Sequence, residues 1–299
     1  MSSPLPALLI EAFTDVPMQG NGAAVVRLAE PVSDAWMAGL ARSLNQSETA
    51  FLLPAPQGWL LRWFTPSCEV KLCGHATLAA LVALRHWQDL PSDGATVFWT
   101  RSGPLPVALA EGVGSIDLPA GQLQHCEAPA TLQQLLQEGL RTRVERFWRS
   151  DLGYSVALLD AQAALASWRF NPALLGPEEA SGLVLMQPLA NDAPRPSVAG
   201  RPADYQLRFF APGLGIAEDP VTGSAHALVT PYWHERLGRS ISVGWQCSDR
   251  PGGMLCQATS SGMIRLSGTG SVLWHGHLQL QSDCCGSAAA TWQQLYGGV

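Results

Sequence analysis

An internal repeat constrains the fold of this chain more than any other feature. Each copy has an aromatic-rich strand closed by Pro, a connector, a turn of small residues and an apolar run, and the copies begin at Arg62 and Leu207. The runs at residues 78–84 and 227–232 are apolar on nearly every face, which is typical of a buried helix. The repeat therefore predicts a duplication, with one central helix in each of two similar domains.

Length and composition agree with two domains and exclude several classes of protein. The chain has 299 residues, and a typical domain has about 100–150. Hydrophobic residues make up 47% of it, which is enough for a large core and excludes a disordered chain. The net charge is −6 and no basic run is present, so a nucleic-acid partner is not expected.

We expect the boundary between the domains near residues 118–130, where Pro119, Gly121 and Pro129 cluster. The predicted domains are an N-terminal one over residues 1–120 and a C-terminal one over residues 121–286. Whether residues 287–299 return to complete the first domain stays open at this point.

The rest of the chain has the pattern of an α/β (α+β) protein. Short predicted strands are interrupted by frequent Gly and Pro, which favours strongly curved sheets that wrap around the two central helices. A surface helix is predicted over residues 34–44, capped by Ser33, and another over residues 132–139.

The cysteines and the N-terminus predict a cytoplasmic protein. Residues 1–6 contain no Lys or Arg, so they lack the charged start of a signal peptide. No apolar run approaches the ~20 residues that span a bilayer, so no membrane is expected. The seven cysteines are scattered and odd in number, which predicts free thiols.

The two turns before the central helices are the first candidate sites. Small residues at Gly74 and Gly223 leave backbone N–H groups free at a helix N-terminus, where the helix dipole favours an anion such as a substrate carboxylate. An acidic stretch precedes each turn, with Glu69 before the first and Glu218 before the second. The alternative is that the glycines only permit close packing.

Three polar side chains could carry proton transfer. Glu48 lies between a predicted helix end and an apolar strand, where burial would raise its pKa towards that of a general acid. His75 lies in the first turn of a buried helix, whose dipole favours a neutral imidazole. Asp219 lies just before the second turn and is as ambiguous as Glu48 between a catalytic and a capping role.

The other histidines favour no metal site. His275 and His277 share one face of a predicted strand, but no third ligand is visible, and His226 is expected to be packed in the second helix. The residues alone therefore predict an anion-binding cleft between two similar domains, with carboxylates, a His and a Ser available for proton transfer.

Five linked motifs resemble those of the PhzF (phenazine-biosynthesis-like) family. They occur in the family's order and cover nearly the whole chain: EAFTDVP with Gly20-Asn21, QSETAF around Glu48, FTP, LCGHATLA around His75, and EDPVTGSAH from Glu218 to His226. The resemblance implies a diaminopimelate-epimerase-like fold with two similar domains, each a curved sheet around a central helix.

The resemblance also implies an isomerase and its site residues. The family's catalytic glutamate falls on Glu48, which would move a proton between two carbons of a small carboxylate-bearing substrate. The residues that would orient or polarise the substrate are His75, Asp219 and Ser224. The expected substrate-binding residues are Gly74, Ala76, Gly223 and Asn21.

The family resemblance implies no cofactor and no metal, and it implies a homodimer. Two positions depart from the family pattern. Gly22 replaces a common Pro, and Lys71 replaces a common acidic residue.

Other functions fit the residues less well. Epimerases of the same fold use two cysteines, but only Cys73 lies at a turn and the second turn has no thiol, so Cys73 is expected to be a buried small residue. A serine hydrolase would need a base and a nucleophile elbow around Ser224, and residues 222–226 do not match that pattern. An inactive small-molecule-binding protein of the same fold is the other alternative.

Overall fold

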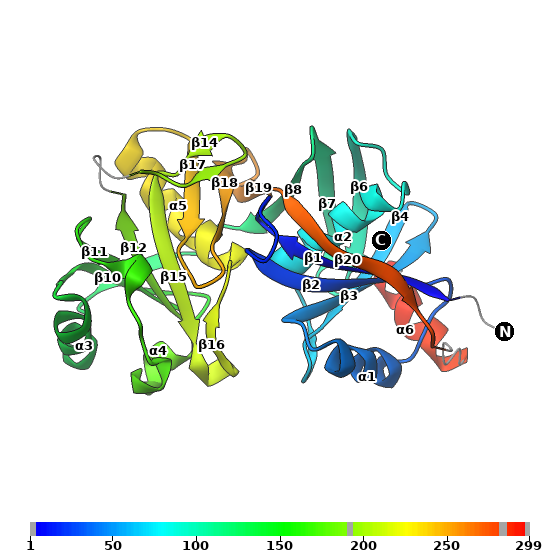
Figure 1. The fold of residues 1–299 in the computed structure, drawn as a ribbon, viewed down its shortest axis with the longest axis horizontal. Helices are drawn as coiled ribbons and strands as arrows, with labels where there is room; N and C mark the ends of the chain where they lie inside the picture. Colours follow the sequence, from blue (N-terminus) through cyan, green and yellow to red (C-terminus); the bar gives the residue numbers. More distant parts are fainter. Residues whose placement is uncertain (1–3, 190–193, 281–285, 297–299) are drawn as a thin grey trace. The chain divides into compact units, whose positions relative to one another are not determined.

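The computed structural model describes residues 4–189, 194–280 and 286–296. The chain divides into two compact units: unit 1 comprises Met1–Asp117 and Ser267–Val299, and unit 2 comprises Leu118–Leu266 (Figure 1). The chain returns from unit 2 to unit 1 after Leu266, which is earlier than the predicted end of the C-terminal domain at residue 286. The reason is that strand β20 (Gly270–Leu278) pairs antiparallel with β1 (Leu5–Ala12) of unit 1.

A curved sheet of eight strands forms unit 1. The neighbours follow the order β20-β1-β2-β3-β4-β6-β7-β8, parallel at β2–β3 and β4–β6 and antiparallel elsewhere. The further strands are β2 (Asn21–Arg27), β3 (Glu48–Ala55), β4 (Gly58–Phe64), β6 (Gly94–Thr100), β7 (Gly103–Ala110) and β8 (Val113–Pro119), and the short β5 (Glu69–Val70) pairs with β4.

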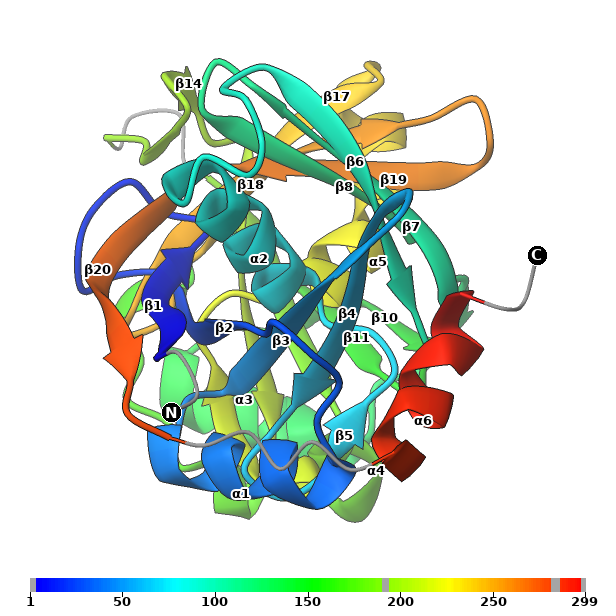
Figure 2. The ribbon, with the colours of Figure 1, turned by 90° about the vertical axis from the view of Figure 1, so that its right-hand side faces the viewer.

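Helix α2 (Gly74–His86) is the central helix of unit 1. Every side chain from His75 to Leu84 is buried, so the helix has no polar face. It contacts β1, β2 and β3, and Figure 2 shows the sheet curving around it. The burial of successive residues on all sides explains the continuous apolar run in the sequence.

Unit 2 repeats this arrangement. Its strands follow the order β9-β10-β11-β12-β15-β17-β18, parallel at β11–β12 and β15–β17 and antiparallel elsewhere. The strands are β9 (Leu123–Cys126), β10 (Val144–Ser150), β11 (Ser155–Leu159), β12 (Leu183–Pro188), β15 (Tyr205–Ala211), β17 (Ile241–Gln246) and β18 (Gly252–Ala258), and the short β16 (Ile216–Asp219) pairs with β15.

The central helix of unit 2 is α5 (Gly223–Leu237). It lies between β16 and β17 in the chain, as α2 lies between β5 and β6, and its residues Ala225 to Thr230 are buried. The alternation of parallel and antiparallel pairs is the same in both units. The predicted duplication with one central helix in each domain is thus confirmed.

The remaining elements cover the sheets. Helix α1 (Asp34–Leu44) begins at the predicted Ser33 cap, where Ser33 Oγ accepts a hydrogen bond of 3.2 Å from the Trp36 N–H. Helix α6 packs Trp292 into the core of unit 1, where its Nε1 donates to the Val32 carbonyl over 3.0 Å. The other elements are α3 (Ala130–Leu140), α4 (Pro177–Ala180), α6 (Gly286–Tyr296), β13 (Ser197–Val198), β14 (Arg201–Pro202) and β19 (Met263–Gly268).

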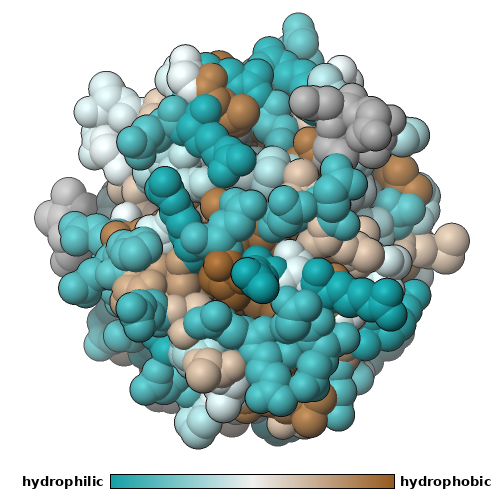
Figure 3. All heavy atoms as spheres, turned by 90° about the vertical axis from the view of Figure 1, so that its left-hand side faces the viewer, coloured by the Kyte–Doolittle hydropathy of each residue, from teal (hydrophilic) through white to brown (hydrophobic). Residues whose placement is uncertain are grey.

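The face of unit 2 in Figure 3 is mainly hydrophilic, with apolar side chains in small separate groups. No helix among the described residues is long and apolar enough to cross a membrane. Five cysteines are free, and Cys284 and Cys285 lie outside the described residues.

Candidate active site

Glu48 and His75 form a buried ion pair in unit 1. Glu48 is the first residue of β3, and His75 is the second residue of α2. Glu48 Oε2 lies 2.9 Å from His75 Nε2, and the two side chains are 13% and 8% exposed. The fold therefore brings together the predicted glutamate and histidine, which are far apart in the sequence, at one edge of α2.

The charge state of this pair differs from the prediction. Burial raises the pKa of Glu48, but the charge and hydrogen bond of His75 outweigh burial, so the pKa of Glu48 is lowered. Burial lowers the pKa of His75, yet Cys73 and Glu48 raise it well above its usual value. The expected neutral imidazole and raised carboxyl pKa are therefore wrong: the pair is a carboxylate and an imidazolium.

Cys73 is the third member of this cluster. Its Sγ lies 3.5 Å from His75 Nδ1 and 3.9 Å from Nε2. Burial and the nearby Glu48 carboxylate raise the pKa of the Cys73 thiol, so the sulfur is protonated and the charge on His75 is balanced by Glu48. Cys73 is buried, as predicted, but it also contacts the candidate catalytic pair.

Asn21 supports His75 from the opposite edge of the imidazole. Its Nδ2 lies 3.2 Å from His75 Nδ1, and its Oδ1 accepts a hydrogen bond of 3.2 Å from Ser47 Oγ. With the amide rotated by 180°, Oδ1 would accept from the imidazolium and Nδ2 would donate to Ser47. Asn21 has no exposed surface and contacts His75 and Ser47, so it can position His75; its role in substrate binding stays a prediction.

The first turn of α2 supplies the other predicted contacts. Gly74 is half-buried and Ala76 is fully buried. Cys73, the N-cap residue, makes no side-chain hydrogen bond of the capping type. Backbone N–H groups in this turn are therefore not occupied by an N-cap oxygen, as an anion site at a helix start requires.

The turn before α5 is held by a network that sequence reasoning missed. Asp219 Oδ2 accepts a hydrogen bond of 2.5 Å from Thr222 Oγ1. The buried Gln246 side chain accepts from the Thr222 N–H over 2.8 Å and donates to the Asp219 carbonyl over 2.6 Å. Gln246 comes from β17, and no local pattern connects it to this turn.

Ser224 has an unpredicted neighbour as well. Its Oγ lies 3.4 Å from the Tyr154 hydroxyl, and Gly223 before it is buried. His226, two residues further, points into the core, where Nδ1 lies 3.0 Å from the Tyr205 hydroxyl. Burial lowers the pKa of His226 to about 3, so it is a neutral core residue and is not positioned as a base for Ser224.

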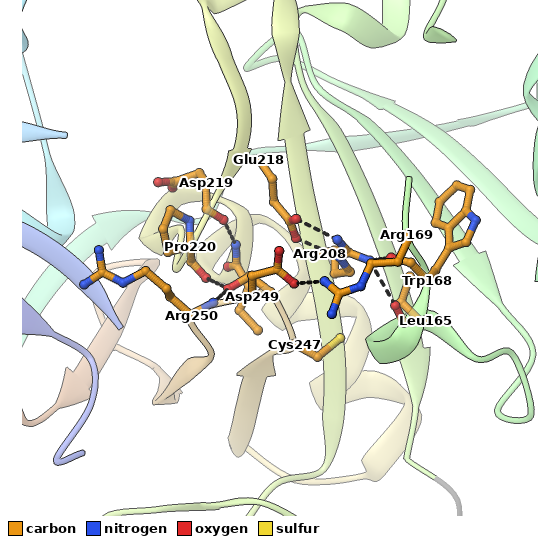
Figure 4. A network of polar contacts seen from close by, with 12 residues as sticks. Leu165, Trp168, Arg169, Arg208, Glu218, Asp219, Pro220, Cys247, Asp249 and Arg250 are labelled. Carbon is orange, nitrogen blue, oxygen red and sulfur yellow. Dashed lines mark hydrogen bonds and ion pairs between the residues drawn. The ribbon is translucent and has the colours of Figure 1, made fainter. Parts of the chain in front are cut away.

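Two buried Arg–Glu pairs hold the connectors in front of the two turns. In unit 1 the Arg62 Nε and Nη2 atoms each donate to Glu69 over 2.7 Å. In unit 2 Arg208 binds both oxygens of Glu218 over 2.7 and 2.6 Å (Figure 4). The acidic residues that drew attention in the sequence therefore belong to matching structural ion pairs.

Three residues of the candidate site also have the chemistry of metal ligands. Glu48, Cys73 and His75 each offer one ligand atom, and these atoms lie within 4.8 Å of one another. Within the described part of the chain they are the one such group of three. The strand histidine His275 instead contacts His86, with 3.2 Å between ring nitrogens.

Comparisons with known proteins agree with the resemblance. The PhzC-PhzF family, described as phenazine biosynthesis-like protein, matches residues 10–276. An uncharacterised isomerase of Pseudomonas aeruginosa is 34% identical over 271 residues, which cover 91% of this chain and 97% of that protein.

Solved structures share the fold. A PhzF-family phenazine biosynthesis protein of Enterococcus faecalis has a TM-score of 0.81 and 28% identity, over 93% of this chain and all of that chain. A hydroxyproline epimerase of Agrobacterium vitis has a TM-score of 0.59 and 11% identity, over 96% of this chain and 98% of that chain. The second likeness concerns the fold alone. The expected diaminopimelate-epimerase-like fold is confirmed.

Proposed function

This chain belongs to the PhzC-PhzF family, and we propose that it moves a proton between two carbons of a small carboxylate-bearing metabolite. By family and fold it is an isomerase. The proposal adds the type of substrate, the residue that carries the proton and the independence from a cofactor.

The observation that carries the proposal is the state of the Glu48 carboxylate. Its Oε2 is buried and is paired with the His75 imidazolium, 2.9 Å from Nε2. A carboxylate has about four lone-pair sites, so the bond from His75 leaves lone pairs that can accept a proton. The lowered pKa keeps Glu48 ionised at neutral pH, so it acts first as a base.

The proposed reaction uses one proton and shifts one double bond. Glu48 removes a proton from a carbon next to an unsaturated group, and the electrons of that C–H bond form a new double bond. The electrons of the original double bond form a new C–H bond at its far carbon, with the proton that Glu48 returns. No atom is gained or lost, as an isomerisation requires.

His75 would stabilise the charge that develops in this step. When Glu48 takes the proton it becomes neutral, so the imidazolium loses its ion-pair partner. Its positive charge then faces the negative charge that grows on the substrate carboxylate, which lowers the barrier most in a buried site. His75 therefore faces one negative charge before the proton transfer, on Glu48, and one after it, on the substrate.

The roles of Asp219 and Ser224 stay part of the proposal. We assign both to binding or orienting the substrate, by the family resemblance. Asp219 is already bound by Thr222, which fits an orienting role better than proton transfer. Asp219→Asn should therefore reduce turnover less than Glu48→Gln does.

The test begins with finding a ligand. Unsaturated and cyclic amino-carboxylic acids are screened by mass spectrometry of the bound complex, each beside its amide. Acids should bind and amides should not. Turnover is then followed in D₂O, where deuterium should enter the carbon that is reprotonated.

Glu48→Gln keeps the shape of the side chain but cannot accept and return the proton. We expect it to bind the ligand and to lose at least ~10²–10⁴-fold in turnover. Glu111→Gln, which changes an exposed carboxylate of the same unit, is the matched control and should turn over normally. Wild-type turnover by Glu48→Gln would show that another residue carries the proton. Ligand binding without any turnover by the wild type would favour the inactive binding protein.

A further inference from the structure

We propose that Glu48, Cys73 and His75 bind a zinc ion, and that the bound zinc switches the isomerase off. The binding part stands on the geometry of the three side chains. The switching part rests on the proposed function, because it requires Glu48 to carry the proton.

The three ligand atoms have nearly the spacing of a tetrahedral zinc site. Glu48 Oε2 lies 2.9 Å from His75 Nε2, and Cys73 Sγ lies 3.9 Å from the same nitrogen. Zinc–ligand bonds of about 2.0–2.3 Å at tetrahedral angles put neighbouring ligand atoms about 3.3–3.6 Å apart. All three ligand atoms lie within 4.8 Å of one another, so side-chain shifts of about 1 Å or less would complete the site.

The backbone already fixes all three ligands. Cys73 is the N-cap residue of α2, His75 is the second residue of that helix, and Glu48 begins β3, which pairs with β2 and β4. The ligands therefore lie on a helix end and a strand and not on long loops. Little conformational entropy is lost when a metal binds to such a site.

A partner for the histidine is also in place. A histidine that binds a metal through Nε2 usually gives its Nδ1 proton to a second residue, which fixes the ring. Asn21 lies 3.2 Å from His75 Nδ1 and is itself held by Ser47. The amide of Asn21, with Oδ1 towards the ring, would accept this proton.

The chemistry of the ligands selects zinc. A thiolate and an imidazole are soft or borderline ligands, which zinc prefers and which magnesium and calcium do not. Binding releases one proton from the Cys73 thiol and one from the His75 imidazolium, so two negative ligands and one neutral ligand surround the dication. The site stays electrically neutral, as it is with the Glu48–His75 ion pair alone.

Bound zinc would block proton transfer. The metal occupies the lone pair of Glu48 Oε2 that the proposed base needs, and it removes the positive charge of His75. The small exposed fractions of Glu48 and His75, 13% and 8%, let an ion reach the cluster from solvent. The three protein ligands leave a fourth position for water.

Cobalt is the probe for binding, because it replaces zinc in tetrahedral sites and reports a thiolate ligand by its absorption. One equivalent of Co²⁺ should give visible bands of tetrahedral cobalt and a sulfur-to-cobalt charge-transfer band, and one equivalent of Zn²⁺ should abolish both. Cys73→Ser should lose the charge-transfer band and bind Zn²⁺ at least tenfold more weakly in calorimetry. Cys68→Ser, which changes an exposed cysteine nearby, is the control and should keep the band.

A second pair of variants tests the site without removing a ligand. Asn21→Leu removes the acceptor for His75 and should weaken Zn²⁺ binding about 10–100-fold. Asn21→Asp retains an acceptor and should bind zinc as the wild type does. Circular dichroism confirms that each variant is folded. An unchanged zinc affinity in Cys73→Ser, or no cobalt band in the wild type, would overturn the site.

The switch has its own measurement. Zn²⁺ at one equivalent should suppress turnover in wild type and Cys68→Ser, and it should have at least tenfold less effect in Cys73→Ser. Full turnover by the zinc-loaded wild type would overturn the switch. If Glu48→Gln proves fully active, the proposed function fails, but the cobalt spectra still decide whether the metal binds.

Discussion

The Arg208–Glu218 pair allows a quantitative test of how much a buried ion pair stabilises each of the two units. The Arg208 side chain is 5% exposed and that of Glu218 is 16% exposed, so both charges lie mostly out of water. Glu218→Gln removes the negative charge and one of the two strong hydrogen bonds. Arg208 then still donates from Nη1 to the carbonyls of Leu165 and Trp168, over 3.2 and 2.5 Å.

We expect Glu218→Gln to lower the free energy of unfolding of unit 2 by about 3–5 kcal/mol, the usual cost of breaking a buried ion pair. The equivalent change in unit 1 should cost less. Glu69→Gln leaves Arg62 bound to the Asp34 carboxylate over 2.8 Å, so we expect about 1–3 kcal/mol. The two variants should differ because Arg62 has a second carboxylate partner, Asp34.

Urea unfolding at neutral pH, followed by circular dichroism and tryptophan fluorescence, measures both variants. Each transition is fitted separately, because two units can unfold at different urea concentrations. A loss below about 1 kcal/mol for Glu218→Gln, which is the value of an exposed pair, would refute this reasoning. An equal loss in both variants would refute the role given to Asp34.

Three more outcomes are expected. His226 has a pKa of about 3 in the folded state, below its value near 6.5 in the unfolded chain, so its contribution to stability is complete above pH 6.5 and falls by about 1.4 kcal/mol per pH unit below it. This residue alone should make the protein about 2 kcal/mol less stable at pH 5 than at pH 7. Urea unfolding at the two pH values should therefore show a smaller change in stability with pH in His226→Gln than in the wild type, and equal changes would contradict the assignment. Trp292→Ala removes a buried ring and its hydrogen bond to the Val32 carbonyl, so it should lower the free energy of unfolding of unit 1 by about 3–5 kcal/mol in thermal or urea unfolding. A loss under about 1 kcal/mol would mean that α6 does not stabilise the core. Cys73→Ser should keep metal-free turnover within about tenfold, roughly 1.4 kcal/mol of barrier, whereas a loss of several orders of magnitude in a folded variant would indicate a thiol mechanism.

The sequence predicted the parts of the fold that repeat locally. The apolar runs gave both central helices, and Ser33 gave the start of α1, because helix burial and capping leave patterns within a few residues. The return of β20 to β1 was missed. Pairing between residues at opposite ends of a chain leaves no local signal, so the second domain boundary was placed too late.

The site was predicted in part, for a similar reason. The motifs identified Glu48 and His75, but not the charge on the pair, which depends on their 2.9 Å separation. Tyr154 and Gln246 were missed because their partners are distant in sequence. Glu218 was noticed for the wrong reason, since its charge is used by Arg208.

The return of the chain to unit 1 has a consequence for how the protein is made. Unit 2 is one continuous segment, Leu118–Leu266, but unit 1 needs both Met1–Asp117 and Ser267–Val299. During synthesis, the whole of unit 2 is made before β20 and α6, so the N-terminal segment of unit 1 has an open sheet edge at β1 and lacks Trp292 in its core until the end of the chain is free to fold. A truncated chain that ends at Leu266 should therefore contain a complete unit 2 and an incomplete unit 1.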